Sequence, residues 1–391
     1  MFLLEPIVAA ALALTPGWTQ ERLVSALGDA GGSFAVSHTD GEGLVAATTL
    51  NECAVTFAGL RPSAPPPVRE LRETLVAGPR LSGDRYVAVL DRRGCGGKTI
   101  DLVDLDATGK VLRRKPLPVR GRAPSFTVLE SGALMWTERR RLRLLVRGAT
   151  EPVTVVRGNV EDVTTATGED GSVFVAWTRG RRVRATTISR SGRVGAAASL
   201  GRSLGAAALK VVRQGRRTIV AWNTWDGMGE TRARLYAAVR DGRRFRPAQL
   251  VDRAPQVDSG YEGFTPSLAP SLAIGPDGRA LVGWHRFHDF NYEARLAAAR
   301  PGHSFGRPRD IDAQELGDVG FDREGHAFVA WTDTRRVFVE IDGVREEVAR
   351  PRFPYALSVS VLDDGRLQAT WFKGWDEEEA LPEVFIATRD W

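Results

Sequence analysis

The sequence predicts an all-β protein, built by repeating one unit of four short antiparallel strands. A three-residue phrase, fullest as Val-Ala-Trp, recurs along the chain, and a Gly-containing turn precedes each copy. Six copies end in Trp136, Trp177, Trp222, Trp284, Trp331 and Trp371, and two degenerate copies end in Ala47 and Val89. Most neighbouring copies lie roughly forty to fifty residues apart, and a fixed period of about this length marks a chain of supersecondary repeats.

The units around Trp284 and Trp177 show the four strands most clearly. In the Trp284 unit the predicted strands are 267–274, 279–284, 294–300 and 309–311. In the Trp177 unit they are 160–166, 172–177, 183–188 and 194–200. Neither unit has a helical period, so each is predicted to form one antiparallel sheet.

The second strand of a unit is apolar on both faces, as in the segment 173–177. An antiparallel sheet with one wet face alternates apolar and polar residues, so we expect a neighbouring sheet on each side. Four-stranded sheets packed face to face around an axis are the blades of a β-propeller. In this repeat the chain resembles the bacterial β-propeller superfamily over nearly its whole length. The resemblance implies a propeller fold. The Asp-box of sialidase-like propellers, the WD40 signature and the paired glycines of kelch blades do not recur, so no family's catalytic residues are carried over.

The two ends of the chain are predicted to complete one sheet together. After Trp371 we expect one further strand, at 384–388, which leaves the last unit one strand short. The segment 18–24 is similar to the fourth-strand segment 245–251. An N-terminal strand that closes the last sheet removes the open edge. The prediction is one domain, residues 18–391, forming an eight-bladed propeller of four-stranded antiparallel blades. Seven blades is the alternative, because the first two copies lack tryptophan.

Arginine dominates the positive charge of the chain. The formal net charge is +6, and only five of the 54 basic residues are lysines. Arginine runs such as 139–141, 181–182, 216–217, 243–244 and 335–336 fall at turns, where we interpret them as solvated; a surface for a polyanion is the alternative. No basic stripe interleaved with aromatic residues accompanies them, so we expect no nucleic-acid partner.

Two features favour export. Residues 7–14 are a short apolar run that suits the core of a signal peptide and is too short to span a bilayer, so 1–17 is expected to be a leader segment and no membrane span is predicted. Cys53 and Cys95 each lie six residues after their own copy of the phrase, Ala47 and Val89, which places them at equivalent positions of neighbouring units. We predict a disulfide between them, and hence an extracellular, periplasmic or cell-envelope location, with the cytoplasm as the alternative.

The predicted binding residues come from the long loops that follow second and fourth strands of units five, six and eight. These loops span 224–231, 252–266, 286–293 and 373–382, and they combine flat aromatic rings with carboxylates. Such a mixture suits a carbohydrate or protein ligand, because rings stack on apolar faces while polar groups fix orientation. The candidate residues are Trp225, Asp226, Tyr261, Glu262, Phe287, His288, Asp289, Tyr292, Trp375 and Asp376. The expected function is a monomeric, non-enzymatic binding scaffold.

Catalysis is the alternative function. Two of Asp226, Glu262, Asp289 and Asp376 would serve a glycan-active hydrolase or lyase if they lay roughly 5–10 Å apart. A third hypothesis is a purely structural module. His285 and His288 are three residues apart on a predicted strand edge, where they point to opposite faces, so we expect no metal. No phosphate loop or nucleophile elbow is present, and no cofactor is expected.

Overall fold

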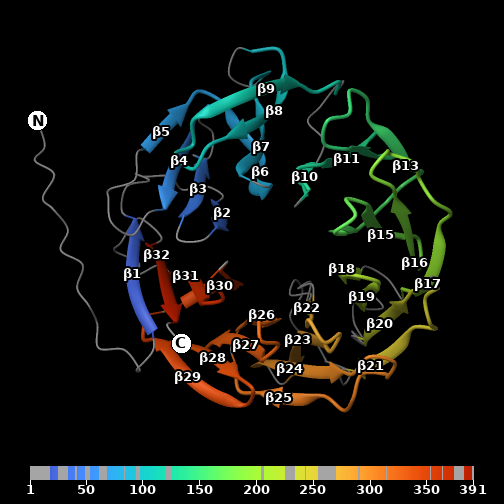
Figure 1. Cartoon of the computed structure of the whole chain (residues 1–391), viewed down its shortest axis with the longest axis vertical. Helices are drawn as coiled ribbons and strands as arrows, with labels where there is room; N and C mark the ends of the chain where they lie inside the picture. Colours follow the sequence, from blue (N-terminus) through green and yellow to red (C-terminus); the bar gives the residue numbers. More distant parts are fainter. Residues whose placement is uncertain are drawn as a thin grey trace, which may run out of the picture.

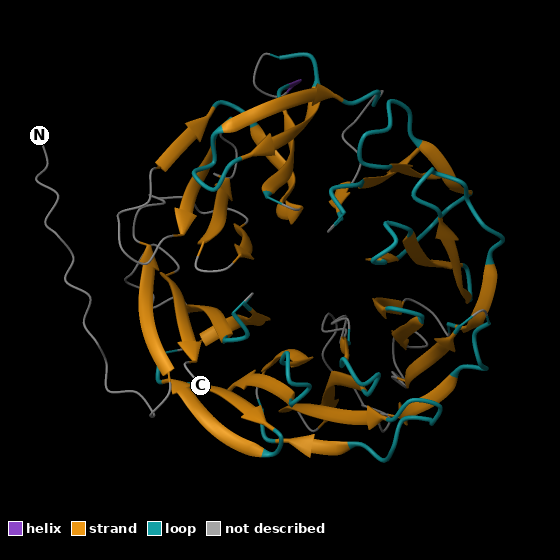
Figure 2. Cartoon of the chain, in the orientation of Figure 1, coloured by secondary structure: helices purple, strands orange, loops and turns teal. Residues whose placement is uncertain are grey.

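The computed structural model is an all-β protein whose sheets follow one another around a ring in chain order (Figures 1 and 2). The structure describes residues 18–24, 34–39, 42–48, 53–60, 68–82, 84–93, 97–119, 126–129, 131–203, 207–224, 234–242, 244–253, 270–288, 291–313, 315–352, 354–362, 364–373 and 383–389. Among these residues, no helix has the length and apolar character that crossing a bilayer requires.

The strands pair into eight four-stranded antiparallel sheets, which we number 1 to 8 in chain order. Sheet 1 contains β2 (Phe34–Thr39), β3 (Glu42–Thr48), β4 (Val55–Leu60) and β5 (Val68–Leu71). Sheet 2 contains β6 (Thr74–Ser82), β7 (Arg85–Asp91), β8 (Ile100–Leu105) and β9 (Val111–Pro116). Sheet 3 contains β10 (Phe126–Val128), β11 (Leu134–Glu138), β12 (Arg141–Leu145) and β13 (Val153–Arg157). Sheet 4 contains β14 (Val163–Thr167), β15 (Val173–Arg179), β16 (Arg182–Ile188) and β17 (Ala198–Arg202).

The second half of the chain continues the same order. Sheet 5 contains β18 (Ala207–Gln214), β19 (Arg217–Thr224), β20 (Arg234–Asp241) and β21 (Gln249–Arg253). Sheet 6 contains β22 (Ser271–Ile274), β23 (Ala280–His288), β24 (Asn291–Ala299) and β25 (Arg309–Ile311). Sheet 7 contains β26 (Glu315–Phe321), β27 (Ala327–Thr332), β28 (Val337–Ile341) and β29 (Val344–Ala349). Sheet 8 contains β30 (Pro354–Val361), β31 (Leu367–Lys373), β32 (Glu383–Arg389) and β1 (Trp18–Val24).

The predicted pairing of the chain ends is confirmed. Strand β1 runs antiparallel to β32, with Trp18 opposite Arg389, and it forms the outer strand of sheet 8 (Figure 1). The first strand of each sheet lies toward the centre of the ring and the fourth toward its rim. In sheet 8 the three inner strands come from the end of the chain, and β1, from its start, supplies the outer strand.

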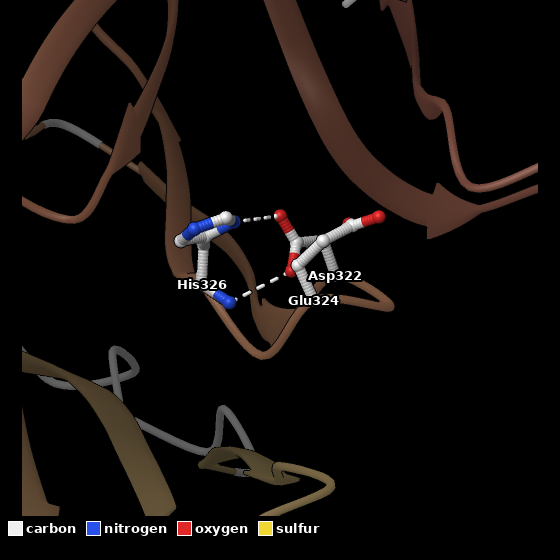
Figure 3. A group of neighbouring side chains, drawn as sticks. All are labelled: Asp322, Glu324 and His326. Atoms are coloured by element: carbon white, nitrogen blue, oxygen red, sulfur yellow. Dashed lines mark hydrogen bonds and ion pairs between the residues drawn. The ribbon is translucent and has the colours of Figure 1, made fainter.

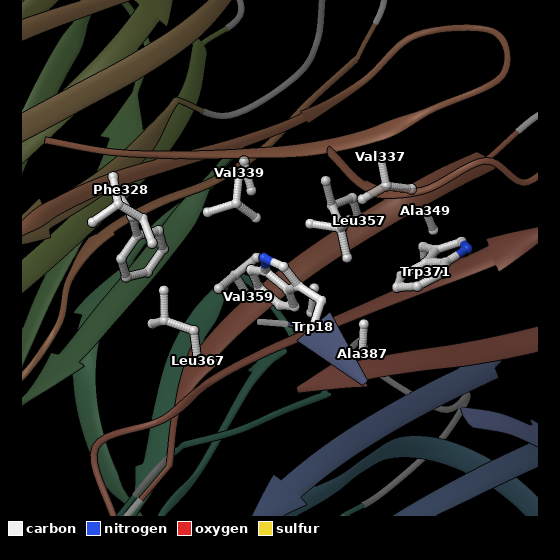
Figure 4. Close-up of a cluster of buried hydrophobic side chains, with 14 residues drawn as sticks. Trp18, Phe328, Val337, Val339, Ala349, Leu357, Val359, Leu367, Trp371 and Ala387 are labelled. Atoms are coloured by element: carbon white, nitrogen blue, oxygen red, sulfur yellow. The ribbon is translucent and has the colours of Figure 1, made fainter. Parts of the chain in front are cut away.

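Buried apolar clusters join consecutive sheets from sheet 1 to sheet 8. Each of seven clusters takes its side chains from two neighbouring sheets, as the second strands' apolar character on both faces predicts. The cluster between sheets 7 and 8 includes the indoles of Trp18 and Trp371 (Figure 4). The sheets therefore cover one another's faces, which is the packing of a β-propeller.

The six recurrent tryptophans are core residues, as predicted. Each lies on the second strand of its sheet and is at most 4% exposed. The residue opposite it on the third strand carries a flat group. This partner is an aromatic residue for Trp222, Trp331 and Trp371, and an arginine for Trp136, Trp177 and Trp284. In sheet 8, for example, Trp371 stacks on Phe385 with ring centroids 5.8 Å apart.

The prediction of a long loop at 286–293 is wrong. Strand β23 continues to His288 and β24 begins at Asn291, so that Phe287 lies opposite Tyr292 and His288 opposite Asn291. The polar residues of this segment suggested a loop. The two strands nevertheless continue past the part of the sheet that neighbouring sheets cover, because their backbone groups bond to each other whatever side chains they carry.

The structure tests the predicted disulfide at only one of its two cysteines. Cys53 lies between β3 and β4, is partly buried, and does not carry a free thiol. Cys95, the other cysteine of the sequence, lies outside the described residues.

Candidate functional site

Most of the predicted binding residues lie outside the described part of the chain. These are Trp225, Asp226, Tyr261, Glu262, Asp289, Trp375 and Asp376. For Phe287, His288 and Tyr292 the structure describes the backbone, which lies in β23 and β24, and not the side chains. The separation of the four candidate carboxylates therefore stays a prediction.

A cleft of about 560 Å³ lies between sheets 4 and 5, at the opposite ends of the strands from the predicted loops. Four arginines line it, and we call it the arginine cleft: Arg193, Arg213, Arg216 and Arg240. Its other polar side chains are Asp170, Ser172, Thr187 and Ser189. These residues come from the turns that join first to second and third to fourth strands, and from the strand ends beside those turns, which share one face of the ring.

A tight turn between β14 and β15 positions the one carboxylate of the cleft. Gly171, with φ of +71°, donates its N–H to the carbonyl of Gly168 at 2.8 Å, a conformation that glycine adopts without strain. Asp170 accepts hydrogen bonds from the hydroxyl of Ser172 at 2.7 Å and from its backbone N–H at 3.0 Å. These bonds, and then the charge of Arg213, hold the pKa of Asp170 below its usual value, so it is ionised at neutral pH.

Arg213 reaches this turn from sheet 5. One guanidinium nitrogen donates to the Ser172 hydroxyl at 2.6 Å and the other lies 3.5 Å from the Asp170 carboxylate. The Arg213 side chain is 12% exposed and Asp170 is 63% exposed, so this single ion pair offsets the buried cation only weakly. The third guanidinium nitrogen, Nε, is buried and has no acceptor among the described residues.

Arg240 is the second partly buried cation of the cleft. Its guanidinium carbon lies 5.1 Å from the ring centroid of Phe174 and 5.3 Å from that of Phe245, within cation–π range of both. It donates to the Thr218 hydroxyl at 3.0 Å, and no described carboxylate contacts it. Burial, and then the nearby positive charge of Arg213, lowers the pKa of Arg240.

The cleft thus carries an excess of positive charge. Arg213 and Arg240 are partly buried and lie close enough to repel, while Arg193 and Arg216 are exposed at its rim. One carboxylate faces four guanidinium groups. Guanidinium groups bind carboxylates, sulfates and phosphates through two parallel hydrogen bonds, so the cleft is suited to an anionic group.

The sequence offered a polyanion surface only as the alternative interpretation of the arginine runs, and it did not single out Arg213 or Arg240. The interpretation of the arginine runs as solvated turns holds for the exposed Arg181, Arg182, Arg335 and Arg336, and it is wrong for Arg217, which is 7% exposed. Arg213 and Arg240 are single arginines within apolar strands, beside the glycine turns at Gly215 and Gly242. An arginine that directly follows an apolar run, as Arg240 follows Val239, was the available signal for a partly buried charge.

A second group of polar side chains lies in the turn between β26 and β27. Ligand atoms of Asp322, Glu324 and His326 lie within 4.8 Å of one another (Figure 3). The Asp322 carboxylate is engaged within the turn: it accepts the His326 backbone N–H at 2.7 Å and contacts the imidazole Nδ1 at 2.7 Å. Glu324 and His326 are exposed. We interpret the group as a turn that Asp322 stabilises. The sequence alone did not indicate that His326 lies beside two acidic residues.

Comparisons with known proteins agree on the fold. No protein-family model matches the chain, and no curated protein matches it. Its structure is similar to that of the polysaccharide lyase Uly1, with a TM-score of 0.53 at 10% identity over 94% of this chain and 92% of the lyase. A eukaryotic initiation factor has a TM-score of 0.50 at 10% identity, over 90% of this chain and 84% of that one. The Dos1 propeller has a TM-score of 0.40 at 10% identity, over 80% and 83%. At 10% identity, the likeness to the lyase and the initiation factor shows a shared fold alone.

Proposed function

We propose that this chain is a non-enzymatic binding scaffold, a closed propeller of eight blades whose arginine cleft takes an acidic glycan. The observation that carries the proposal is the pair Arg213 and Arg240, two partly buried guanidinium groups with one weak carboxylate partner between them. An incoming anionic group relieves their mutual repulsion and accepts their hydrogen bonds.

The other side chains of the cleft favour a glycan among anionic ligands. Ser172, Thr187 and Ser189 place hydroxyl groups beside the arginines. Hydroxyl groups donate and accept hydrogen bonds, so they suit the hydroxyls of a sugar ring while guanidinium groups hold its carboxylate or sulfate. The volume of about 560 Å³ lies within the usual range for small-ligand sites.

The cleft gives no support to catalysis. Glycoside hydrolysis uses two carboxyl groups, of which the acid has a raised pKa. The lining of the cleft contains one, Asp170, and its pKa is lowered by its bonds to Ser172. The alternative function, a hydrolase or lyase using Asp226, Glu262, Asp289 and Asp376, would act on the other face of the ring.

The predicted loop residues on that other face form a second part of the proposal. Replacing Trp225 or Trp375 by alanine is expected to weaken binding of a carbohydrate or protein ligand there more than it lowers the stability of the fold.

The disulfide Cys53–Cys95 and export also belong to the proposal, supported by the absence of a free thiol at Cys53. Mass spectrometry of non-reduced protein tests the disulfide, and two free thiols would contradict it.

A glycan array tests the proposed ligand class. We expect uronate-containing or sulfated glycans to bind and their neutral counterparts not to bind. Arg213→Gln is expected to reduce binding about 10- to 100-fold, because hydrogen bonds to charged groups contribute about 1.5–3 kcal/mol. Arg335→Gln, at an exposed arginine of sheet 7, removes the same charge elsewhere and is expected to bind as the wild type does. Equal binding of neutral glycans would overturn the proposal.

A further inference from the structure

Between sheets 5 and 6, one carboxylate joins a tryptophan and an arginine of the next sheet. Asp252, on β21, accepts the indole N–H of Trp284 at 3.0 Å and a guanidinium N–H of Arg295 at 2.8 Å. Trp284 and Arg295 lie opposite each other on β23 and β24. The side chains of Asp252 and Arg295 are 12% and 15% exposed, so the charges are paired where water is scarce.

Sheet 4 repeats the tryptophan and the arginine without the carboxylate. Trp177 lies opposite Arg184 on β15 and β16, as Trp284 lies opposite Arg295. In the preceding sheet, Val156 pairs with Leu142 just before the bulge of the outer strand, as Asp252 pairs with Leu235. Val156 therefore occupies the position of Asp252.

Side-chain contacts confirm this equivalence of positions. Val156 packs in the same buried cluster as Trp177. Gly201, at the same register position of sheet 4, faces Trp222 of sheet 5, because a Cβ there would lie 2.9 Å from that ring. The position therefore faces the tryptophan of the next sheet in each case, and a valine cannot accept its hydrogen bond.

Two donors are left without acceptors as a result. Trp177 is 2% exposed, and its indole Nε1 has no hydrogen-bond partner in the described part of the chain. The Nε of Arg184 is also buried and without an acceptor there. A buried donor that lacks a partner destabilises a fold by about 1–3 kcal/mol. Sheet 3 has the same pair in Trp136 and Arg143. There the Arg143 guanidinium donates to Thr154 at 2.8 Å, while the Nε1 of Trp136 and the Nε of Arg143 lack an acceptor among the described residues.

A cavity of about 210 Å³ lies against this pair, between β13 and sheet 4. Trp177, Arg184 and Val156 line it, together with two exposed arginines, Arg157 and Arg179, and no carboxylate. The apolar part of the lining comes from valines and an alanine. The cavity is smaller than the usual range of about 300–1,000 Å³ for ligand sites, so it suits a small acid or one acidic group of a larger molecule.

We propose that this cavity is a carboxylate-binding site, in which a ligand's carboxylate takes the place that the Asp252 carboxylate occupies between sheets 5 and 6. The indole N–H of Trp177 and the guanidinium of Arg184 donate to its two oxygens. Val156 and the neighbouring aliphatic side chains contact the carbon attached to the carboxylate. The site is separate from the arginine cleft in its ligating residues and does not depend on the function proposed for that cleft.

Titration calorimetry with sodium acetate, glucuronate and the methyl ester of glucuronate tests the proposal. We expect the two carboxylates to bind and the ester, which keeps the sugar and lacks the charge, not to bind. A stronger response to glucuronate than to acetate assigns the site to an acidic sugar, and the reverse assigns it to a small organic acid. Failure of both carboxylates to bind overturns the proposal.

Three substitutions locate the binding. Trp177→Phe and Arg184→Gln each remove a donor and are expected to weaken carboxylate binding at least about tenfold, as the loss of one charge-assisted bond implies. Arg335→Gln, at an exposed arginine of sheet 7, is expected to change it by less than about twofold. Carboxylate binding that Arg213→Gln abolishes and Arg184→Gln spares would place the anion in the arginine cleft and overturn this site.

Val156→Asp is the sharpest variant, because it restores the carboxylate that sheet 5 carries. We expect it to abolish binding of acetate and glucuronate and to melt at a higher temperature than Val156→Asn, which has the same shape without the charge. Should both variants fail to fold, Trp177→Phe and Arg184→Gln still decide the outcome. A folded Val156→Asp that binds acetate as tightly as the wild type contradicts the proposal.

Discussion

At the scale of single residues, each tryptophan of the repeat combines an apolar ring with a polar edge. The rings fill the space between sheets, while the hydrogen-bond acceptor of the indole N–H differs from one sheet to the next. In the repeat, Trp284 donates to Asp252 and Trp222 to the carbonyl of Arg202 at 3.2 Å, and on the closing strand Trp18 donates to Glu346 at 2.8 Å. The repeat thus conserves the packing role of the side chain, and the hydrogen-bond partner varies with the neighbouring sheet.

Removing one of these rings tests its packing role. Trp331 is 2% exposed and stacks on Phe338 with centroids 5.5 Å apart. Trp331→Ala is expected to lower the free energy of unfolding by about 3–5 kcal/mol, because a large side chain is lost from a closely packed site. Chemical denaturation measures the change, and a loss below about 1 kcal/mol would mean that the ring is not packed between sheets.

His285 makes the stability of the fold depend on pH. Its Nε2 accepts the backbone N–H of Leu316 at 2.6 Å, which requires the neutral ring, and burial lowers its pKa from 6.5 to about 4. Because the unfolded chain binds the proton more readily, stability is expected to fall as the pH drops from about 6.5 to about 4, by up to about 3 kcal/mol, and this group adds nothing below that range.

The variant His285→Gln provides the control for this pH dependence. Its amide oxygen still accepts a hydrogen bond but does not titrate. Denaturation curves at pH 7 and pH 4.5 are expected to differ less for the variant than for the wild type, and an equal difference would assign the acid sensitivity to other groups.

At the scale of strands and turns, ion pairs and hydrogen bonds from arginine join neighbouring sheets. Arg147 of sheet 3 donates to the Ser82 hydroxyl of sheet 2 at 2.8 Å, and Arg246 of sheet 5 donates to the Gly302 carbonyl of sheet 6 at 2.8 Å. Arg217, though part of an arginine run, is 7% exposed and reaches the Gly278 carbonyl of sheet 6. Arginine suits this use, since its planar group offers several donors at the end of a long apolar stem.

One glutamate links the closing strand β1 to sheet 7. Glu346 of β29 accepts two hydrogen bonds from Arg389, at 2.8 and 2.9 Å, as well as the one from Trp18. Glu346→Gln is expected to destabilise the fold by about 1–3 kcal/mol, because its partners are largely buried. Glu347→Gln is the matched control: it pairs with the 78% exposed Arg350 and is expected to change stability by about 1 kcal/mol or less. Equal effects of the two substitutions would show that β1 is not held in this way.

At the scale of the whole molecule, the sequence predicted the repeated sheets and the closing strand well. Hydrophobic periodicity marks strands that are buried on both faces, and the observed β1 and β25 have the predicted bounds, 18–24 and 309–311. The arginine cleft was missed because it forms where turns of two sheets meet. Periodicity shows which residues of a strand are buried, but it does not show which turn lies beside Arg213 or Arg240. For the same reason, the equivalence of Val156 in sheet 3 to Asp252 in sheet 5 is recognised only when the strand register is known.

The central claim is that the arginine cleft binds acidic glycans through Arg213 and Arg240. Titration calorimetry with a sulfated oligosaccharide, at low and high salt, tests it most directly on the wild type, on the double variant Arg213→Gln/Arg240→Gln and on Arg335→Gln. The account predicts that the wild type and Arg335→Gln bind with an affinity that falls as salt rises, and that the folded double variant loses at least about tenfold. Undiminished binding by the double variant would contradict it.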